Sequence, residues 1–148
     1  MTFNPSVEQQ DFKKFFVSVE PVGSRITCDP APQNTDEDYL CYIGPLDQAN
    51  LNKNLERIGF DAESMATYED DSGEHNAVFM SYRRDDVNLI VTAKKEFFDK
   101  FMLATYVAKT LNLLQKEQRI TLFQAILYQH RWSGPIEMMS EIGEEHVL

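Results

Sequence analysis

The chain has 148 residues, which fits a single domain, and 43% of them are hydrophobic, which is enough for a core and argues against intrinsic disorder. The formal net charge is −10, and so acidic a surface repels a phosphate backbone, so nucleic-acid binding is not expected. We expect one domain over residues 1–148, with an acidic tail at 131–148.

The two cysteines, Cys28 and Cys41, do not form a recognisable metal-binding or disulfide pattern. They are thirteen residues apart and belong to no Cys-x-x-Cys motif, so neither a zinc site nor a disulfide framework is expected. Cys41 falls in a predicted strand and is interpreted as a small core residue. The N-terminus lacks a basic segment followed by an apolar one, and no apolar run approaches the roughly 20 residues of a membrane span. We therefore expect a cytoplasmic protein without membrane contact.

The first half of the chain predicts two helices and two strands. Apolar spacing and turn residues place a helix over 6–16, a strand over 17–22 that runs into a Gly-Ser turn, a loop over 25–35, a strand over 38–43 and a helix over 46–58 that stops at Gly59.

The second half predicts a polar loop, a hairpin and two further helices. In order these are the loop over 61–76, strands over 77–82 and 87–92 around a turn at 83–86, a helix over 95–114 and a helix over 119–129. Because the strands come early and the helices late, the sequence predicts an α+β fold with a small mixed sheet covered by helices.

Two sets of side chains are given structural roles. The phenylalanines at 97, 98 and 101 are spaced as the buried face of a helix and are interpreted as core. The basic doublets, among them Arg83-Arg84 at the hairpin turn, are interpreted as solvated surface pairs.

The most informative stretch is a Gly-Ser turn followed by two closely spaced aspartates. Gly23 and Ser24 end the first predicted strand, and Asp36 and Asp38 stand at the head of the second, Asp36 being twelve residues after Ser24. Residues i and i+2 of a strand share a face, so the two carboxylates are expected to point the same way. Carboxylate oxygens are the ligands that Mg²⁺ prefers, so this pair is a candidate cation site.

This pattern resembles the minimal form of the nucleotidyltransferase superfold, in which a strand, a Gly-Ser turn and an Asp-x-Asp strand follow one another. The resemblance covers roughly the first two-thirds of the chain. It implies that Gly23 and Ser24 bind the triphosphate of a nucleotide, with Arg25 placed to reach the phosphates. It also implies that Asp36 and Asp38 are catalytic and coordinate two Mg²⁺ ions.

The sequence departs from this family at the third acidic position. In the family a later strand commonly carries an aspartate between apolar residues, and here the corresponding residue is Asn88. An amide oxygen can ligate a cation, but it adds no negative charge and is a poor base. Asp86, two residues earlier, is a candidate substitute, so the implied metal ligands are Asp36, Asp38, Asp86 and Asn88.

Two functions follow from the resemblance. The first is a metal-dependent transfer of a nucleoside monophosphate from a nucleoside triphosphate to a hydroxyl acceptor. The second is a catalytically degenerate member that binds nucleotides or acts as an interaction or inhibitor module toward a protein partner. Segments at 88–92, 111–114 and 119–125 also resemble small proteins encoded by tailed bacteriophages, for which the location would be the host cytoplasm and the partner a host protein.

Overall fold

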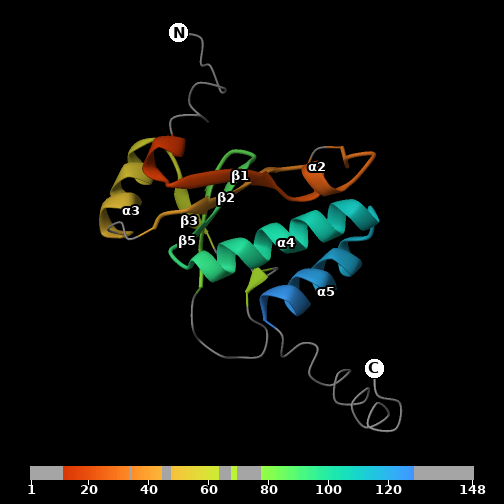
Figure 1. The fold of residues 1–148 in the computed structure, drawn as a ribbon. Coiled ribbons are helices and arrows are strands. Elements are labelled where there is room, and N and C mark those ends of the chain that lie inside the picture. Colours follow the sequence, from red (N-terminus) through yellow and green to blue (C-terminus); the bar gives the residue numbers. More distant parts are fainter. Residues whose placement is uncertain (1–11, 34, 45–47, 64–67, 70–77, 129–148) are drawn as a thin grey trace, which may run out of the picture.

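A computed structural model describes residues 12–33, 35–44, 48–63, 68–69 and 78–128 of the chain (Figure 1). Its elements in chain order are η1 (Phe12–Phe15), β1 (Ser18–Val22), α2 (Ser24–Thr27), β2 (Glu37–Tyr42), α3 (Gln48–Arg57), β3 (Asp61–Glu63), β4 (Met80–Arg84), β5 (Val87–Thr92), α4 (Lys95–Leu111) and α5 (Lys116–Leu127).

The strands form one mixed sheet in the order β1-β2-β5-β4-β3. The central pair, β2 and β5, is parallel, and the other neighbouring strands pair antiparallel. Every residue of β5 is buried, as expected for a strand with packed elements on both faces. The predicted α+β class with a small mixed sheet and helices is confirmed.

The two faces of the sheet carry separate apolar cores. One core packs α3 and η1 against the sheet and includes Phe12, Leu55 and Phe60. The other packs α4 and α5 against the opposite face and includes Phe101 and Phe123. Figure 1 shows α4 and α5 side by side along one face of the sheet, with α3 away from them.

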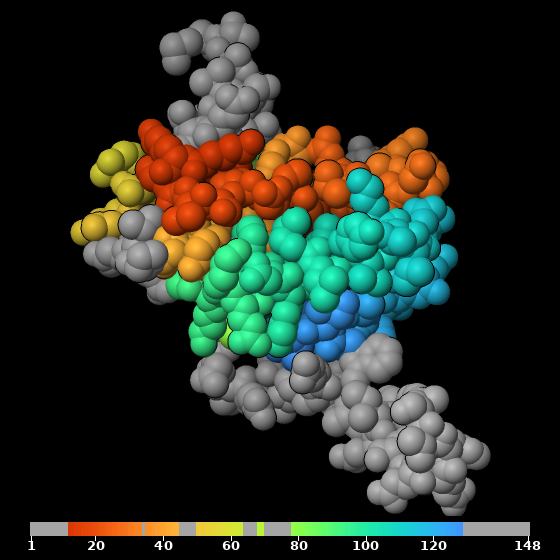
Figure 2. Space-filling model, viewed as in Figure 1, coloured from red at the N-terminus to blue at the C-terminus, as the bar shows by residue number. Residues whose placement is uncertain are grey.

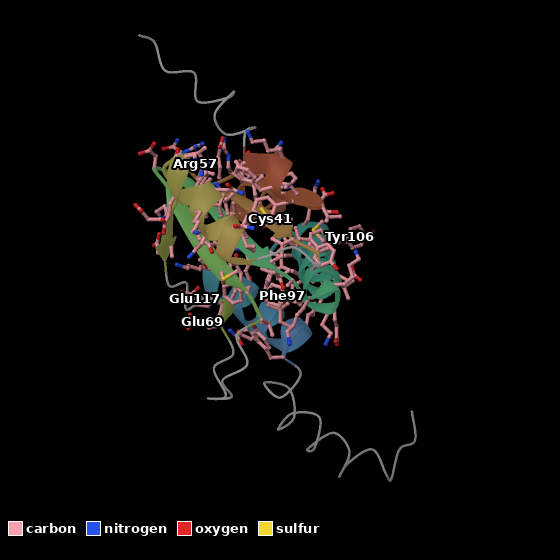
Figure 3. All side chains as sticks on the ribbon, turned by 90° about the vertical axis from the view of Figure 1, so that its left-hand side faces the viewer. Cys41, Arg57, Glu69, Phe97, Tyr106 and Glu117 are labelled. Carbon is pink, nitrogen blue, oxygen red and sulfur yellow. The ribbon has the colours of Figure 1, made fainter. Side chains whose placement is uncertain are left out.

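Alternation along β2 explains this division. Leu40 belongs to the core under α4, whereas its neighbour Cys41 belongs to the core under α3, because successive strand side chains point to opposite faces. Cys41 is fully buried, as predicted. Phe97 lies between α4 and the sheet, whereas Tyr106 points outward from the same helix (Figure 3). The phenylalanine cluster of α4 is therefore core, also as predicted.

The boundaries differ from the predictions at several places. The structure adds β3, where the sequence predicted only a polar loop. It also adds a short helix, α2, which begins at Ser24 itself and takes the first residues of the loop predicted over 25–35. The hairpin turn is only Asp85 and Asp86, so β4 extends to Arg84. The last described helix, α5, begins at Lys116 rather than at 119. The predicted helix over 6–16 and the tail at 131–148 lie largely or wholly outside the described residues.

Within the described residues, no helix combines the length and the apolar character needed to cross a bilayer. Figure 2 shows α4 on the face toward the viewer. Leu103 and Tyr106 of this helix are each more than half exposed.

Candidate functional site

The sheet register brings three polar side chains into one row. Asp38 on β2 is the partner of Asn88 on β5, and Asn88 is in turn the partner of Arg83 on β4. All three lie on the face that carries α4 and α5, and all three line the same cavity. Asn88 is thus directly beside the aspartate pair and brings an amide to it.

The Gly-Ser turn closes against the same row because its first residue has no side chain. Gly23 has a φ of +84°, which favours glycine, and a Cβ there would lie 3.0 Å from the Cβ of Asp38 and would overlap its carboxylate. The carbonyl of Gly23 accepts hydrogen bonds from Ile26 and Thr27, which form the turn of α2. Glycine therefore allows the turn to approach Asp38 closely.

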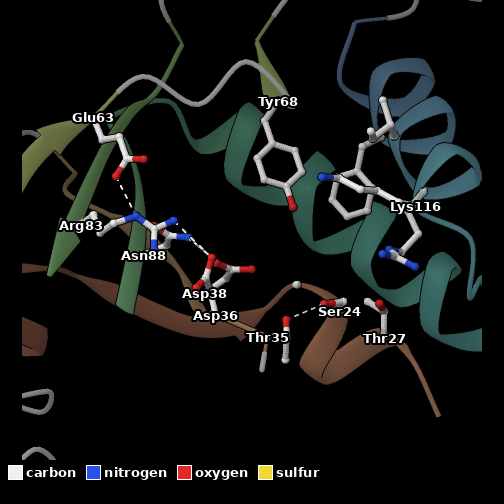
Figure 4. A pocket seen from close by; sticks show the side chains of 14 residues that line it. Ser24, Thr27, Thr35, Asp36, Asp38, Glu63, Tyr68, Arg83, Asn88 and Lys116 are labelled. Atoms are coloured by element: carbon white, nitrogen blue, oxygen red, sulfur yellow. Dashed lines mark hydrogen bonds and ion pairs between the residues drawn. The ribbon is translucent and has the colours of Figure 1, made fainter. Parts of the chain in front are cut away.

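Together these segments surround a cavity of about 320 Å³ (Figure 4). This volume is at the lower end of the range of roughly 300–1,000 Å³ that small-molecule sites span. The lining combines acidic, basic, hydroxyl and apolar side chains, which are Asp36, Asp38, Glu63, Arg83, Lys116, Arg119, Ser24, Thr27, Thr35, Tyr68, Asn88, Ile120 and Phe123, together with Gly23.

Hydrogen bonds already engage the two aspartates. The amide nitrogen of Asn88 donates to Asp38 Oδ1 over 2.9 Å and lies 3.4 Å from Asp36 Oδ2. Arg83 Nη2 donates to the same Asp36 oxygen over 3.2 Å, and Arg83 Nε donates to Glu63 Oε2 over 2.7 Å. Asp36 and Asp38 thus meet in one cleft as the sequence predicted, and donors from β4 and β5 hold them there.

The surroundings change the acidity of this cluster. Burial is the main reason why the pKa of Asp38 is raised from 3.8 to about 6, and the nearby charge of Asp36 raises it further, against the hydrogen bond from Asn88. The hydrogen bond to Asp36 raises the pKa of Arg83. Burial also raises the pKa of Tyr68, so its hydroxyl remains a hydrogen-bond donor at neutral pH.

The opposite wall of the cavity comes from α5 and from Tyr68. Figure 4 shows Lys116 on the α5 side and the hydroxyl of Tyr68 pointing into the space between that helix and the aspartates. Arg119 Nη1 donates to the carbonyl of Leu113 over 2.9 Å, which fixes the arginine at the corner between α4 and α5. Phe123 is buried and its ring lies 5.4 Å from that of Tyr68. This wall offers positive charge beside an aromatic surface.

Two residues of the predicted site lie elsewhere. Arg25 does not line the cavity, and its Nη1 lies 2.8 Å from Glu37 Oε1 in an ion pair on the flank of β2. Asp86 is exposed in the hairpin turn, where its carbonyl accepts a hydrogen bond from the amide of Glu37. The turn precedes β5, so Asp86 does not share the position of Asn88 in the row.

The sequence reading missed several residues of the cavity, and Arg83 is the most important of them. It was interpreted as part of a solvated turn, but its guanidinium lies inside the cavity between Asp36 and Glu63. A two-residue turn at Asp85 and Asp86 would have revealed this, because it pairs Arg83 with Asn88. No pattern in the sequence marks the other missed residues, Lys116, Arg119 and Tyr68, as part of the site. Only the packing of distant segments brings them to the aspartates.

These residues do not fit the two Mg²⁺ ions that the family resemblance implies. Two carboxylates remain instead of three, and both already accept hydrogen bonds, one of them from a guanidinium. Among the described residues, no group of three or more His, Cys, Asp or Glu side chains is arranged to hold a metal ion. The donor set therefore lacks the negative charge that a pair of divalent cations requires.

Comparisons with protein-family models, with curated proteins and with solved structures found no significant match. The resemblance to nucleotidyltransferases accordingly rests on the sequence motif alone.

Proposed function

We propose that this protein is a nucleotide-binding module of the nucleotidyltransferase type, and that its cavity binds a nucleoside triphosphate without transferring any part of it. The observation that carries the proposal is the row of Asp38, Asn88 and Arg83 beside the Gly23-Ser24 turn. In this proposal the row corresponds to the acidic centre of a nucleotidyltransferase, but an amide and a guanidinium donate to one oxygen of each aspartate.

The cavity has the mixture of groups that a nucleotide requires. Hydroxyls of Ser24, Thr27 and Tyr68 and the charges of Lys116 and Arg119 suit phosphate oxygens. Ile120, backed by the buried ring of Phe123, provides an apolar surface for a base. We assign the phosphates to the side between α2 and α5, where cations face the cavity, and not to the carboxylate row.

Transfer of a nucleoside monophosphate to a hydroxyl is the second candidate function, because Asp36 and Asp38 do converge on one cleft. Asp38 is the candidate base of the row, because its pKa is raised to about 6, but the hydrogen bond from Asn88 holds its carboxylate and no third carboxylate takes over the role of metal ligand. The donors that Arg83 and Asn88 direct at this pair are the reason for preferring the binding module.

Two measurements on the full chain distinguish these functions. Isothermal titration calorimetry with each of the four common nucleoside triphosphates is expected to show binding to one or more of them. Incubation with α-labelled triphosphates, Mg²⁺ and cell lysate is expected to show no label transfer. Transfer that Asp36→Ala and Asp38→Ala together abolish would establish the enzyme instead. Absence of nucleotide binding with every triphosphate would refute the module and favour a role directed at a protein partner.

A further inference from the structure

The position of Arg83 has a consequence for the chemistry of the site. Its guanidinium contacts acidic groups on two sides, Asp36 over 3.2 Å and Glu63 over 2.7 Å. Only about a third of its side chain is exposed, and a guanidinium keeps its positive charge at any physiological pH. The carboxylate cluster therefore holds a permanent cation supplied by the chain itself.

We infer that Arg83 and Asn88 take the place of divalent cations at the Asp36–Asp38 pair, so that this pair does not recruit a metal ion. This inference deepens the proposed function. What it says about the form in which a nucleotide binds rests on that proposed function. Arg83 supplies positive charge to Asp36, and Asn88 supplies a hydrogen bond to Asp38. Together they replace the charge neutralisation and the positioning that metal ions would provide.

Competition between Arg83 and a metal follows from distance and charge. A Mg²⁺ ion binds carboxylate oxygens at roughly 2.0–2.1 Å in near-octahedral geometry. An ion bridging the two aspartates would lie close to the guanidinium that donates to Asp36 Oδ2, and two cations so close repel each other. Glu63 holds the guanidinium from its other side, which opposes its release.

The side chain of Asn88, like that of Arg83, is held in place by its surroundings. It is 4% exposed and lies on β5 between β2 and β4, with its amide nitrogen toward the carboxylates. Metal ligation would require the amide oxygen to turn toward the ion, and the hydrogen bond to Asp38 would then be lost.

The charges around the cavity are consistent with a ligand that brings no metal. Its lining holds three acidic side chains, Asp36, Asp38 and Glu63, and three basic ones, Arg83, Lys116 and Arg119. Arg83 offsets part of the negative charge of the acidic side, and Lys116 and Arg119 on the opposite wall remain to attract phosphate. The nucleotide would accordingly bind in its metal-free form.

The direct test uses Mn²⁺ alone as a spectroscopic probe, without nucleotide. Electron paramagnetic resonance should show negligible Mn²⁺ binding to the wild-type protein. The double variant Arg83→Gln/Asn88→Asp, which removes the internal cation and restores a third carboxylate, should bind Mn²⁺ more tightly by roughly tenfold or more. Arg84→Gln is the matched control, because Arg84 stacks on Phe60 at 4.4 Å and donates to the carbonyl of Ile58 instead of lining the cavity.

Wild-type affinity for Mn²⁺ equal to that of the double variant would overturn the inference. Circular dichroism checks the folding of each variant, and Arg83→Gln alone, which adds no buried charge, serves if the double variant fails to fold. In that case Arg83→Gln should bind Mn²⁺ more tightly than wild type, and unchanged binding would contradict the role of Arg83.

Calorimetry with the triphosphate in excess EDTA and then in Mg²⁺ gives a second, independent result. Binding should be at least as tight in EDTA, whereas a strict need for Mg²⁺ would count against a metal-free site. If no nucleotide binds under either condition, the proposed function fails, while the Mn²⁺ measurement still decides whether Arg83 and Asn88 exclude a metal.

Discussion

Asp38 is the residue in which the conflict between burial and charge is greatest. It faces Gly23 on one side and accepts a hydrogen bond from Asn88 on the other. Because burial disfavours its ionised form, its pKa is raised from 3.8 to about 6. Between these two values the folded protein retains a proton that the unfolded chain has released, so the free energy of unfolding falls as the pH rises through this window.

Asp38→Asn should remove this part of the pH dependence. The variant keeps an oxygen that accepts the hydrogen bond from Asn88 and has no charge to bury. Its free energy of unfolding relative to wild type should increase by on the order of 2 kcal/mol between about pH 4 and pH 7. Urea denaturation at both pH values measures it, with Asp99→Asn, an exposed ion-pair residue on α4, as the control. Identical pH slopes for Asp38→Asn and wild type would disprove the effect of burial.

At the scale of elements, α5 gives the cavity its cationic wall. Lys116 is exposed in the first turn of this helix, and the described residues provide no ion-pair partner for it. Arg119, one turn later, is instead tied to the carbonyl of Leu113 and lies 3.4 Å from the sulfur of Cys28. Replacing Arg119 should therefore affect the stability of the fold, whereas replacing Lys116 should not.

Lys116→Ala should weaken nucleotide binding by roughly threefold to tenfold and leave stability unchanged, because only a solvated charge is lost. Arg119→Ala should weaken binding and also lower the free energy of unfolding, since the carbonyl of Leu113 loses its guanidinium donor and keeps only the weak thiol donor of Cys28. Calorimetry measures the affinities and urea denaturation the free energies of unfolding.

Lys109→Ala, at the end of α4 and outside the cavity lining, is the control. If Lys109→Ala weakens binding as much as Lys116→Ala does, the phosphates are attracted only by general surface charge.

For the molecule as a whole, the sheet separates two cores of which only one supports the cavity. Phe101 on α4 is fully buried, and its ring lies 4.8 Å from that of Tyr68 and 4.9 Å from that of Phe123, both of which line the cavity. Leu55 on α3 is also fully buried, but it belongs to the core on the other face.

Phe101→Ala and Leu55→Ala should both destabilise the fold, by about 3–5 and about 2–5 kcal/mol, because each leaves a void in a packed core. Only Phe101→Ala should also weaken nucleotide binding, since Tyr68 and Phe123 lose the ring that positions them. Urea denaturation gives the stabilities, and calorimetry at a temperature where both variants remain folded gives the affinities. Equal losses of affinity would mean that the two cores act on the cavity together.

Much of the fold was predictable because its signals are local. Alternation marked β1, apolar runs beside turn residues marked β2 and β5, and the spacing of the phenylalanines marked α4. The short strand β3 was not predictable, since its three residues are all exposed and it forms only by pairing with β4. The start of α5 was misplaced because Lys116 to Gln118 are polar and carry no apolar period.

The sequence by itself determined the α+β class, the Gly23-Ser24 turn and the pair Asp36 and Asp38 on one face, because each depends on residues close together in the chain. It also identified Asn88 as the departure from the family pattern. Only the tertiary structure decided that Asn88 and Arg83 donate to that pair, and that Lys116 and Arg119 face it across the cavity. The physical reason is that strand register and helix packing join residues about fifty to eighty positions apart in the chain, which no local pattern records.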